Sequence, residues 1–432
     1  MRLLKSIFVI TILFALTGSA FAGTELKKMK IFYDAQFGYQ ARDIGSGQNN
    51  ADWTHEFNFR RNRFGFIGQL NKMIGFYYQA EYVEDKVIGN ISVDDESNSS
   101  KSFYTLDAQV RFTFLDWLNV RVGKFKHNLT RENLEGCFTP LTNDRSYFVY
   151  APFHSSRDLG VAVWGNVLDG WLQYRIDAME GKKKDGTPAP SSNFRYTGRI
   201  HVSVFDKEKS YGYKGTYLGK KQVLTIGASA QYEPNAVYDN VTAKTGIHDY
   251  LAYSFDIFYE QPTSAGAFTV SAAFLNVSFD GAHKGTDYDI GAVGAYGTRN
   301  GFYAKAGWLM PWQIGPGKMQ LFARYDYFKY ARLLTATGST NYTVGFAGGG
   351  FNYYIMGQAL KITGEFSMID FTYDFIDPLL TDYFTFKLFL QARFQIGLSG
   401  KTGAVTADAD GEERVNLNAK GSDDSSDDLE GC

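Results

Sequence analysis

The stretch NFRYTGRIHVSVFD, Asn193–Asp206, decides the fold class of this chain. Its even positions form an apolar face of Phe194, Tyr196, Gly198, Ile200, Val202 and Val204. Its odd positions form a polar face of Asn193, Arg195, Thr197, Arg199, His201 and Ser203. A strand directs successive side chains to opposite faces, so this segment is a two-faced strand. The pattern recurs along the chain, which is the sequence signature of a transmembrane β-barrel.

The composition agrees with a barrel and argues against a helical membrane protein. The mean hydropathy of the 432 residues is −0.27. After Ala22 the chain has no apolar run of the roughly 20 residues that a membrane helix needs. The 36 Phe, 29 Tyr and 45 Gly suit aromatic girdles and closely packed strands, and the scarcity of Pro, with 9, suits central strands.

The first residues form a secretory signal. Arg2 and Lys5 precede the apolar run Ile7–Leu16, and the sequence Ala20-Phe21-Ala22 fits the small-x-small cleavage rule. We therefore expect a signal peptide over residues 1–22, a barrel domain over 23–394 and a tail over 395–432. Export of this kind places the barrel in the outer membrane of a Gram-negative bacterium.

The alternation predicts an all-β fold, a 16-stranded antiparallel transmembrane barrel. About seventeen segments alternate, and bacterial barrels close with an even number of strands. The weakest segments are Phe268–Phe279 and Tyr288–Tyr296, so we choose 16 rather than 18. Near Arg60 the phase of the alternation changes, because Phe57 and Phe59 are odd but Phe64 is even. This change predicts a β-bulge.

Residues 125–157 keep neither a strand period nor a helix period. A connection of that length inside a compact fold is usually functional. We expect it to fold into the lumen as a constriction loop.

The polar faces assign a set of basic side chains to the lumen. Rings of Arg and Lys select anions, and the planar fork of Arg suits oxyanions. The predicted pore and anion-binding residues are Arg60, Arg61, Arg63, Arg111, Arg121, Lys124, Lys126, Arg131, Arg195, Arg199 and Arg324. Acidic residues such as Asp107 and Asp326 share these faces, so a salt bridge within the wall is the alternative interpretation of any single cation.

The tail and the cysteines carry little predicted function. Residues 395–432 hold nine acids against three bases, whereas the net charge of the whole chain is −2, so the barrel region is mildly basic. We predict a solvated, disordered tail. The chain has two cysteines, Cys137 and Cys432, and we expect no structural disulfide, metal site or cofactor.

The sequence does not favour catalysis or nucleic-acid binding. The six His are scattered without metal-ligand spacing, and no nucleophile elbow or phosphate-binding loop is present. The charge balance argues against a nucleic-acid binder.

Three sequence blocks resemble the phosphate-selective porin O/P family. They are FNFRRNRFGFIGQL (Phe57–Leu70), VRVGKFKHNLTRENL (Val120–Leu134) and SRDLGVAVWG (Ser156–Gly165). The resemblance implies a 16-stranded outer-membrane porin, commonly a trimer, whose third loop folds into the pore. It also implies that Arg60, Arg61, Lys124, Lys126 and Arg131 line an anion path.

Two functions follow from these observations. The first is passive diffusion of small anions, such as phosphate or a similar oxyanion, through a barrel that contacts outer-membrane lipid and assembles as a homotrimer. The second is a sheath or scaffold that docks a periplasmic or extracellular redox partner, for which the acidic tail is the candidate docking element. An enzyme is a distant third. The loop over 125–157 separates the first two, because an inward loop leaves little room for an inserted protein.

Overall fold

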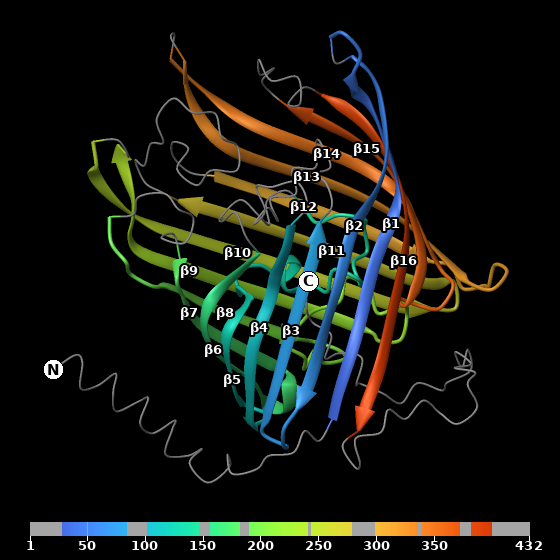
Figure 1. Ribbon diagram of the computed structural model, residues 1–432, viewed down its shortest axis with the longest axis horizontal. Helices are drawn as coiled ribbons and strands as arrows, with labels where there is room; N and C mark the ends of the chain where they lie inside the picture. The colour runs from blue at the N-terminus through green and yellow to red at the C-terminus, as the bar shows by residue number, and fades with distance from the viewer. Residues whose placement is uncertain are drawn as a thin grey trace.

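The computed structural model describes residues 28–49, 51–83, 102–146, 156–181, 190–240, 243–278, 299–335, 338–371 and 382–399. These residues form sixteen strands, one short α-helix and one 3-10 turn (Figure 1). The first eight strands are β1 (Lys28–Ser46), β2 (Asp52–Gln69), β3 (Ile74–Val83), β4 (Ser102–Leu115), β5 (Leu118–Lys126), β6 (Arg157–Val167), β7 (Leu172–Met179) and β8 (Arg195–Ser203). The second eight are β9 (Val223–Asn240), β10 (Thr245–Thr263), β11 (Gly266–Ser278), β12 (Arg299–Leu309), β13 (Lys318–Thr335), β14 (Gly338–Tyr354), β15 (Leu360–Phe371) and β16 (Tyr383–Ser399). The helices are α2 (Arg131–Leu134) and η2 (Leu168–Gly170).

The strands close into one antiparallel barrel in which each strand pairs with its sequence neighbours. Closure is made by β1 and β16, in register from Lys28 opposite Ser399 to Arg42 opposite Thr385. The predicted count of 16 strands is confirmed. The weak segment Phe268–Phe279 corresponds to β11, and Tyr288–Tyr296 lies outside the described residues.

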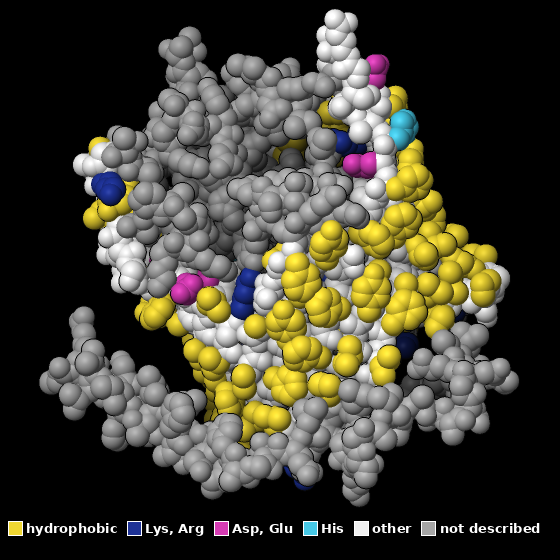
Figure 2. All heavy atoms as spheres, viewed as in Figure 1, with side chains coloured by type: hydrophobic (Ala, Val, Ile, Leu, Met, Phe, Trp, Pro, Cys, Tyr) yellow, Lys and Arg dark blue, Asp and Glu magenta, His cyan; other side chains and the backbone are white. Residues whose placement is uncertain are grey.

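The predicted faces are also confirmed. In β8 the burial alternates residue by residue: Arg199 is 2% exposed and Ile200 is 52% exposed. Large apolar side chains point outward from nearly every strand, and Figure 2 shows them gathered over the outer surface of one side of the barrel. The apolar side chains of this outer layer contact lipid, while the polar side chains of each strand face the lumen.

The two ends of the barrel differ in their connections. Residues 70–73, 116–117, 168–171 and 264–265 make short turns at the end where β1 begins and β16 ends, whereas the longest connections, such as 84–101 and 127–156, lie at the other end. Short turns mark the periplasmic side of such barrels. The exception at the turn end is the 19-residue connection 204–222 between β8 and β9.

The domain boundaries differ slightly from the prediction. Strand β16 continues to Ser399, so residues 395–399 belong to the barrel rather than to the tail. The predicted signal peptide and the rest of the tail lie outside the described residues. None of the helices in the described ranges has the length and apolar character needed to cross a membrane.

Candidate functional site: two segments inside a basic barrel

Residues 127–146, called the inner loop here, contact inward side chains from several parts of the wall. Its helix α2 is capped by Thr130, whose hydroxyl accepts from the Asn133 amide at 3.1 Å. Beyond the helix, wall side chains hold the loop backbone: Gln391 donates to the Phe138 carbonyl at 2.9 Å, and Asn352 to the Leu141 carbonyl at 2.8 Å. Residues 147–155 of the predicted constriction loop lie outside the described residues.

Further contacts of the inner loop come from both sides of the barrel. Asn128 donates to Asp177 of β7 at 2.7 Å, and the Asn143 amide donates to Glu365 of β15 at 2.9 Å. Lys305 of β12 pairs with Glu132. These contacts place the described part of the inner loop against the inner face of the wall, with anchors on strands that are far apart in the barrel.

A second segment, residues 204–222, meets the inner loop from the turn end; we call it the turn-side segment. The two segments exchange backbone hydrogen bonds, from Tyr213 to the Leu134 carbonyl at 3.1 Å and from Gly136 to the Tyr213 carbonyl at 3.0 Å. This segment was not predicted from the sequence. The length of the segment could have revealed it, because no other connection at the turn end is comparably long among the described residues.

Arg131 links these two segments. Its guanidinium donates to both oxygens of Glu208, at 2.7 and 2.8 Å, and lies over the Tyr213 ring at 4.3 Å. Burial would raise the pKa of Glu208, but the Arg131 guanidinium lowers it to about 2. The side chain of Arg131, a predicted anion-binding residue, is thus engaged in a buried ion pair that positions the inner loop.

Three other predicted pore residues form ion pairs within the wall. Arg195 donates to Glu233 at 2.9 Å, and Arg199 donates to both oxygens of Asp256 at 2.6 and 2.8 Å. Arg63 is held by both oxygens of Glu81 at 2.8 and 2.9 Å. Bidentate pairs of this kind fix the cation and cancel its charge.

Arg324, also predicted, contacts three inward groups. It pairs with Asp326, lies 3.9 Å from Glu365, and donates to the Asp144 carbonyl at 2.8 Å. Its position between two wall carboxylates and the inner loop makes it another anchor of that loop.

The predicted β-bulge is confirmed, and it directs two adjacent arginines inward. Gln36 lies opposite Arg61, whereas the next residue, Phe37, lies opposite Phe59. Arg60 is therefore the extra residue of β2. Since Phe59 and Phe64 both face outward, Arg60 and Arg61 share the lumen side, which regular alternation forbids.

These arginines belong to a group of cations that we call the bulge cluster, formed by Arg60, Arg61, Lys361, Lys387 and Arg393. Within the described residues, Arg60 and Lys387 both contact Asp144, the latter at 2.6 Å, and Arg393 pairs with Asp34 at 3.0 Å. Arg61 donates to the neutral Gln36, and Lys361 lies 5.7 Å from the Tyr354 ring. Within the described residues the ion pairs of these five cations involve two carboxylates, Asp144 and Asp34, while Glu81 acts on Arg61 and Glu56 on Lys387 through space.

The inner loop covers the bulge cluster with an aromatic ring. The Phe138 centroid lies 5.9 Å from the guanidinium carbon of Arg61 and 5.1 Å from that of Arg393. Both distances are within the range of cation–π attraction. The ring holds the cations in place without neutralising them.

Lys124 and Lys126, both predicted, bind backbone carbonyls. Lys124 donates to the Thr105 carbonyl at 2.7 Å, and Lys126 donates at 2.7 Å to the carbonyl of Glu135 on the inner loop. Burial raises the pKa of the Glu135 side chain to about 7, although Arg131 opposes the shift. The charge of this loop therefore changes near neutral pH.

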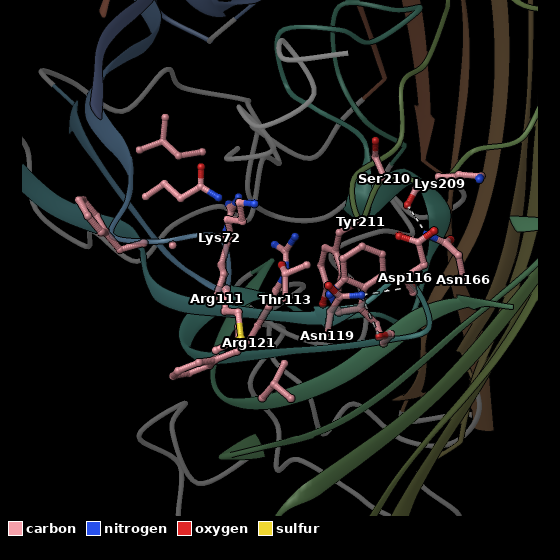
Figure 3. A pocket seen from close by; sticks show the side chains of 18 of the residues that line it. Lys72, Arg111, Thr113, Asp116, Asn119, Arg121, Asn166, Lys209, Ser210 and Tyr211 are labelled. Carbon is pink, nitrogen blue, oxygen red and sulfur yellow. Dashed lines mark hydrogen bonds between the residues drawn. The ribbon is translucent and has the colours of Figure 1, made fainter. Parts of the chain in front are cut away.

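Arg111 and Arg121, the last two predicted residues, line a cavity of about 650 Å³ at the turn end (Figure 3). Arg111 lies 4.9 Å from the Tyr77 ring, and Arg121 lies 3.6 Å from the ring of Tyr211 in the turn-side segment. The basic side chains around this vestibule are Lys30, Lys72, Arg111, Arg121, Lys207, Lys209 and Lys221, and its one acid is Asp116. Lys72, Lys207, Lys209 and Lys221 were not predicted, because they lie in connections that show no alternation; Lys30 lies in β1 and was not among the predicted residues either.

Cys137 corrects one expectation. It is disulfide-bonded, although the sequence analysis expected no structural disulfide. The residue is 2% exposed and packs beside Phe138 on the inner loop.

The comparisons with known proteins agree with this geometry. The family model described as phosphate-selective porin O and P matches residues 31–374. No curated protein sequence matches the chain.

Among solved structures, the barrel resembles an anion-selective porin from Comamonas acidovorans, with 10% identity, a TM-score of 0.51, and coverage of 85% of this chain and 100% of that chain. It also resembles OmpF of Salmonella typhi in complex with daunomycin (14% identity, TM-score 0.57, 85% and 98% coverage). A third similar structure is the outer membrane channel DcaP of Acinetobacter baumannii (12% identity, TM-score 0.54, 85% and 98% coverage). At such identities the likeness shows the fold alone.

Proposed function

This chain belongs to the phosphate-selective porin O and P family and is an outer-membrane porin of a Gram-negative bacterium, and we propose that its pore conducts small anions. The preferred class is an oxyanion such as phosphate. The family match confirms the resemblance indicated by the three sequence blocks. The finer assignment of substrate rests on the charges of the lumen.

The bulge cluster is the observation that carries the proposal. It gathers five cations against two carboxylates within the described residues, and Arg60 and Arg61 enter the lumen side by side because of the bulge. An excess of fixed cations in a narrow lumen lowers the free energy of a partly dehydrated anion. Two adjacent guanidinium groups also present the paired donors that match an oxyanion.

The order of basic groups supports an anion path through the barrel. Seven basic side chains and one acid line the vestibule at the turn end, and two of the seven, Lys207 and Lys209, also pair with Asp169 at 2.5 and 2.9 Å. The bulge cluster lies beside the inner loop. We infer that the inner loop and the turn-side segment together narrow the lumen between these two regions.

We infer further that the porin acts as a homotrimer in contact with outer-membrane lipid, and that it is not an enzyme. The family resemblance favours a trimer, and the apolar outer face supports contact with lipid. Family and fold are those of channels. The molecular mass of the detergent-solubilised protein, measured by light scattering with the detergent subtracted, tests the trimer.

The alternative of a sheath around a redox partner is less well supported. A sheath needs a wide lumen, whereas here two chain segments lie inside the wall and bind each other. Their ion pair between Arg131 and Glu208 is buried, so they are not easily displaced by an inserted protein.

Reversal potentials in planar bilayers test the proposal. We expect the refolded protein in a potassium chloride gradient to be anion-selective, and added phosphate to reduce the chloride current by occupying the same cations. Sulfate serves as a matched oxyanion and gluconate as a bulky anion without the oxyanion geometry. A cation-selective current would overturn the proposal. An anion-selective current that phosphate and sulfate leave unchanged would remove the oxyanion preference.

A further inference from the structure

Three inward side chains near the bulge cluster hold polar atoms that nothing in the described chain pairs with. They are Arg42 of β1 and Glu56 and Asn58 of β2. The Nε and Nη2 atoms of Arg42, the Oε1 atom of Glu56 and both amide atoms of Asn58 are enclosed, yet they have no hydrogen-bond partner among the described residues. Enclosed polar atoms without a partner are rare, because they have lost water and gained no bond in return. These atoms therefore point to a polar ligand.

The register of the strands brings the three side chains together. The strands β16, β1 and β2 are neighbours in the barrel (Figure 1). Glu56 lies opposite Gln40, and Arg42 follows Gln40 by two residues, so Arg42 and Glu56 are diagonal neighbours on the lumen side. Asn58 lies between Glu56 and Arg60 on the same side of β2. We call Arg42, Glu56 and Asn58 the outer subsite, because it lies between the bulge cluster and the end of the barrel opposite the turn end.

Glu56 differs from the paired carboxylates of the wall. Glu81 and Asp256 each accept from an arginine through both oxygens. Glu56 forms no hydrogen bond or ion pair with the described chain, although Arg42 and Lys387 act on it through space. Its side chain is half-buried, whereas Arg42 is buried. The outer subsite therefore offers a ligand a guanidinium and a carboxylate as neighbours.

We propose that Glu56 selects oxyanions that carry a proton, such as hydrogen phosphate, over oxyanions that carry none, such as sulfate. Arg42 and Asn58 supply N–H donors to the oxygens of either ion. The P–O–H group of hydrogen phosphate donates to the Glu56 carboxylate. Sulfate has no proton at neutral pH, so it would place a bare oxygen against this carboxylate and be repelled. The inference rests on the proposed function and names the class of oxyanion that the pore prefers.

The discrimination does not depend on the size or the total charge of the ion. At pH 8 hydrogen phosphate and sulfate are both tetrahedral and predominantly doubly charged, so the fixed cations of the lumen attract them alike. Their difference is the single O–H group. A site built to hydrogen-bond a hydroxyl group strongly rejects an analogue that lacks it, because the buried partner is then left unpaired. Glu56 is the side chain of the outer subsite that can act only as an acceptor when ionised.

Reduction of the chloride current by added oxyanions tests the outer subsite. The full chain is refolded into planar bilayers at pH 8, and phosphate, arsenate, sulfate and selenate are added in separate titrations. All four ions are then predominantly doubly charged, but only phosphate and arsenate carry a proton. We expect phosphate and arsenate to halve the current at concentrations at least about tenfold lower than sulfate and selenate.

Three variants assign the preference to Glu56. E56Q keeps the shape of the side chain, but its amide can donate to an oxygen of sulfate, so the difference between phosphate and sulfate should fall below about threefold. E56D keeps a carboxylate and should retain part of the difference. R42Q removes donors that serve both ions, so it should weaken the effect of phosphate and sulfate alike and leave their ratio unchanged. The chloride conductance of each variant without added oxyanion shows that its barrel has folded.

The outcomes separate the outer subsite from the pore itself. If phosphate and sulfate act equally on the parent protein, or if E56Q leaves their ratio unchanged, Glu56 does not select the protonated ion although the oxyanion pore stands. If arsenate follows sulfate rather than phosphate, the proton is not what the site recognises, and the inference is wrong. A chloride current that none of the four ions reduces would instead overturn the proposed oxyanion preference.

Discussion

On the side of β8 and β9 each inward arginine meets a carboxylate, whereas in the bulge cluster five cations meet two. Arg195 and Arg199 are held by Glu233 and Asp256 and act as part of the wall. Arg61 donates to a neutral amide and lies over an aromatic ring, and the carboxylates of Asp144 and Glu81 act on it only through space, without an ion pair. Facing the lumen is therefore not enough to place a cation on the proposed anion path. What matters is whether the wall supplies an acid beside it, from the next strand, as Glu233 of β9 does for Arg195, or from one strand further, as Asp256 of β10 does for Arg199.

The largest expected effect is on stability, at the paired side. Arg199→Ala leaves Asp256 buried without its bidentate partner, which costs about 3–5 kcal/mol. Arg61→Ala loses a hydrogen bond to a neutral amide and should cost about 1 kcal/mol. Urea unfolding of the barrel in lipid vesicles, followed by tryptophan fluorescence, measures both free energies.

A double replacement provides the control for this difference. Removing both charges with Arg199→Leu and Asp256→Leu should restore most of the lost stability, because no buried charge is left alone. If Arg199→Ala and Arg61→Ala lower the free energy of unfolding by the same amount, the ion pair of Arg199 does not make it more important for stability than Arg61.

The next prediction compares the lipid-facing and lumen-facing sides of β8. Ile200→Arg places an arginine beside the native Arg199 but on the lipid side, where it should cost about 2–4 kcal/mol near the membrane midplane. Ile200→Leu is the matched control for volume. Folding yield into vesicles and urea unfolding measure the change. A variant with unchanged yield and stability would show that Ile200 does not face lipid.

A smaller effect is expected on selectivity, at the bulge cluster. Replacing Arg60 and Arg61 with Ala removes two cations and should lower the anion-to-cation permeability ratio. One charge at 4 Å in water contributes about 1 kcal/mol, which is roughly a fivefold change in ion partitioning. Reversal potentials in a potassium chloride gradient measure this ratio.

The paired side supplies the control for selectivity. Arg195→Gln with Glu233→Gln removes one cation and one carboxylate, so the net charge of the lumen is preserved. This variant should keep the reversal potential of its parent. If it shifts the potential as much as the loss of Arg60 and Arg61 does, charge excess is not what selects anions.

The sequence was sufficient for the faces and the bulge, because both depend on local alternation. The strand number needed a second rule, since about seventeen segments alternate and only the even number of strands in a closed barrel led to 16. The phase change between Phe59 and Phe64 is visible without any structure, and it places Arg60 and Arg61 correctly. Alternation could not show that Asp256 neutralises Arg199 or that Glu208 engages Arg131, since those pairs join residues 57 and 77 positions apart. The turn-side segment and the disulfide of Cys137 were missed for the same reason.

The smallest expected effect is a pH dependence of anion selectivity, caused by Glu135 on the inner loop. Burial raises the pKa of Glu135 to about 7, with Arg131 opposing and Glu132 adding to the shift. Lys305 and Arg145 also act on this carboxyl group. Glu135 is therefore neutral below pH 7 and negative above it, so anion selectivity should fall as the pH rises from 6 to 8.

Glu135→Gln tests this dependence because it keeps the shape of the side chain and fixes it in the neutral form. The variant should hold the selectivity of the acidic state across the whole range, while the parent loses part of it. The sign for stability is the same: a carboxyl group with a raised pKa favours the folded state less as the pH rises from its usual 4.5 toward 7. The variant should then gain stability relative to its parent at pH 8. Parallel pH profiles for the two proteins would assign the dependence to another group and leave the charge excess of the bulge cluster independent of pH.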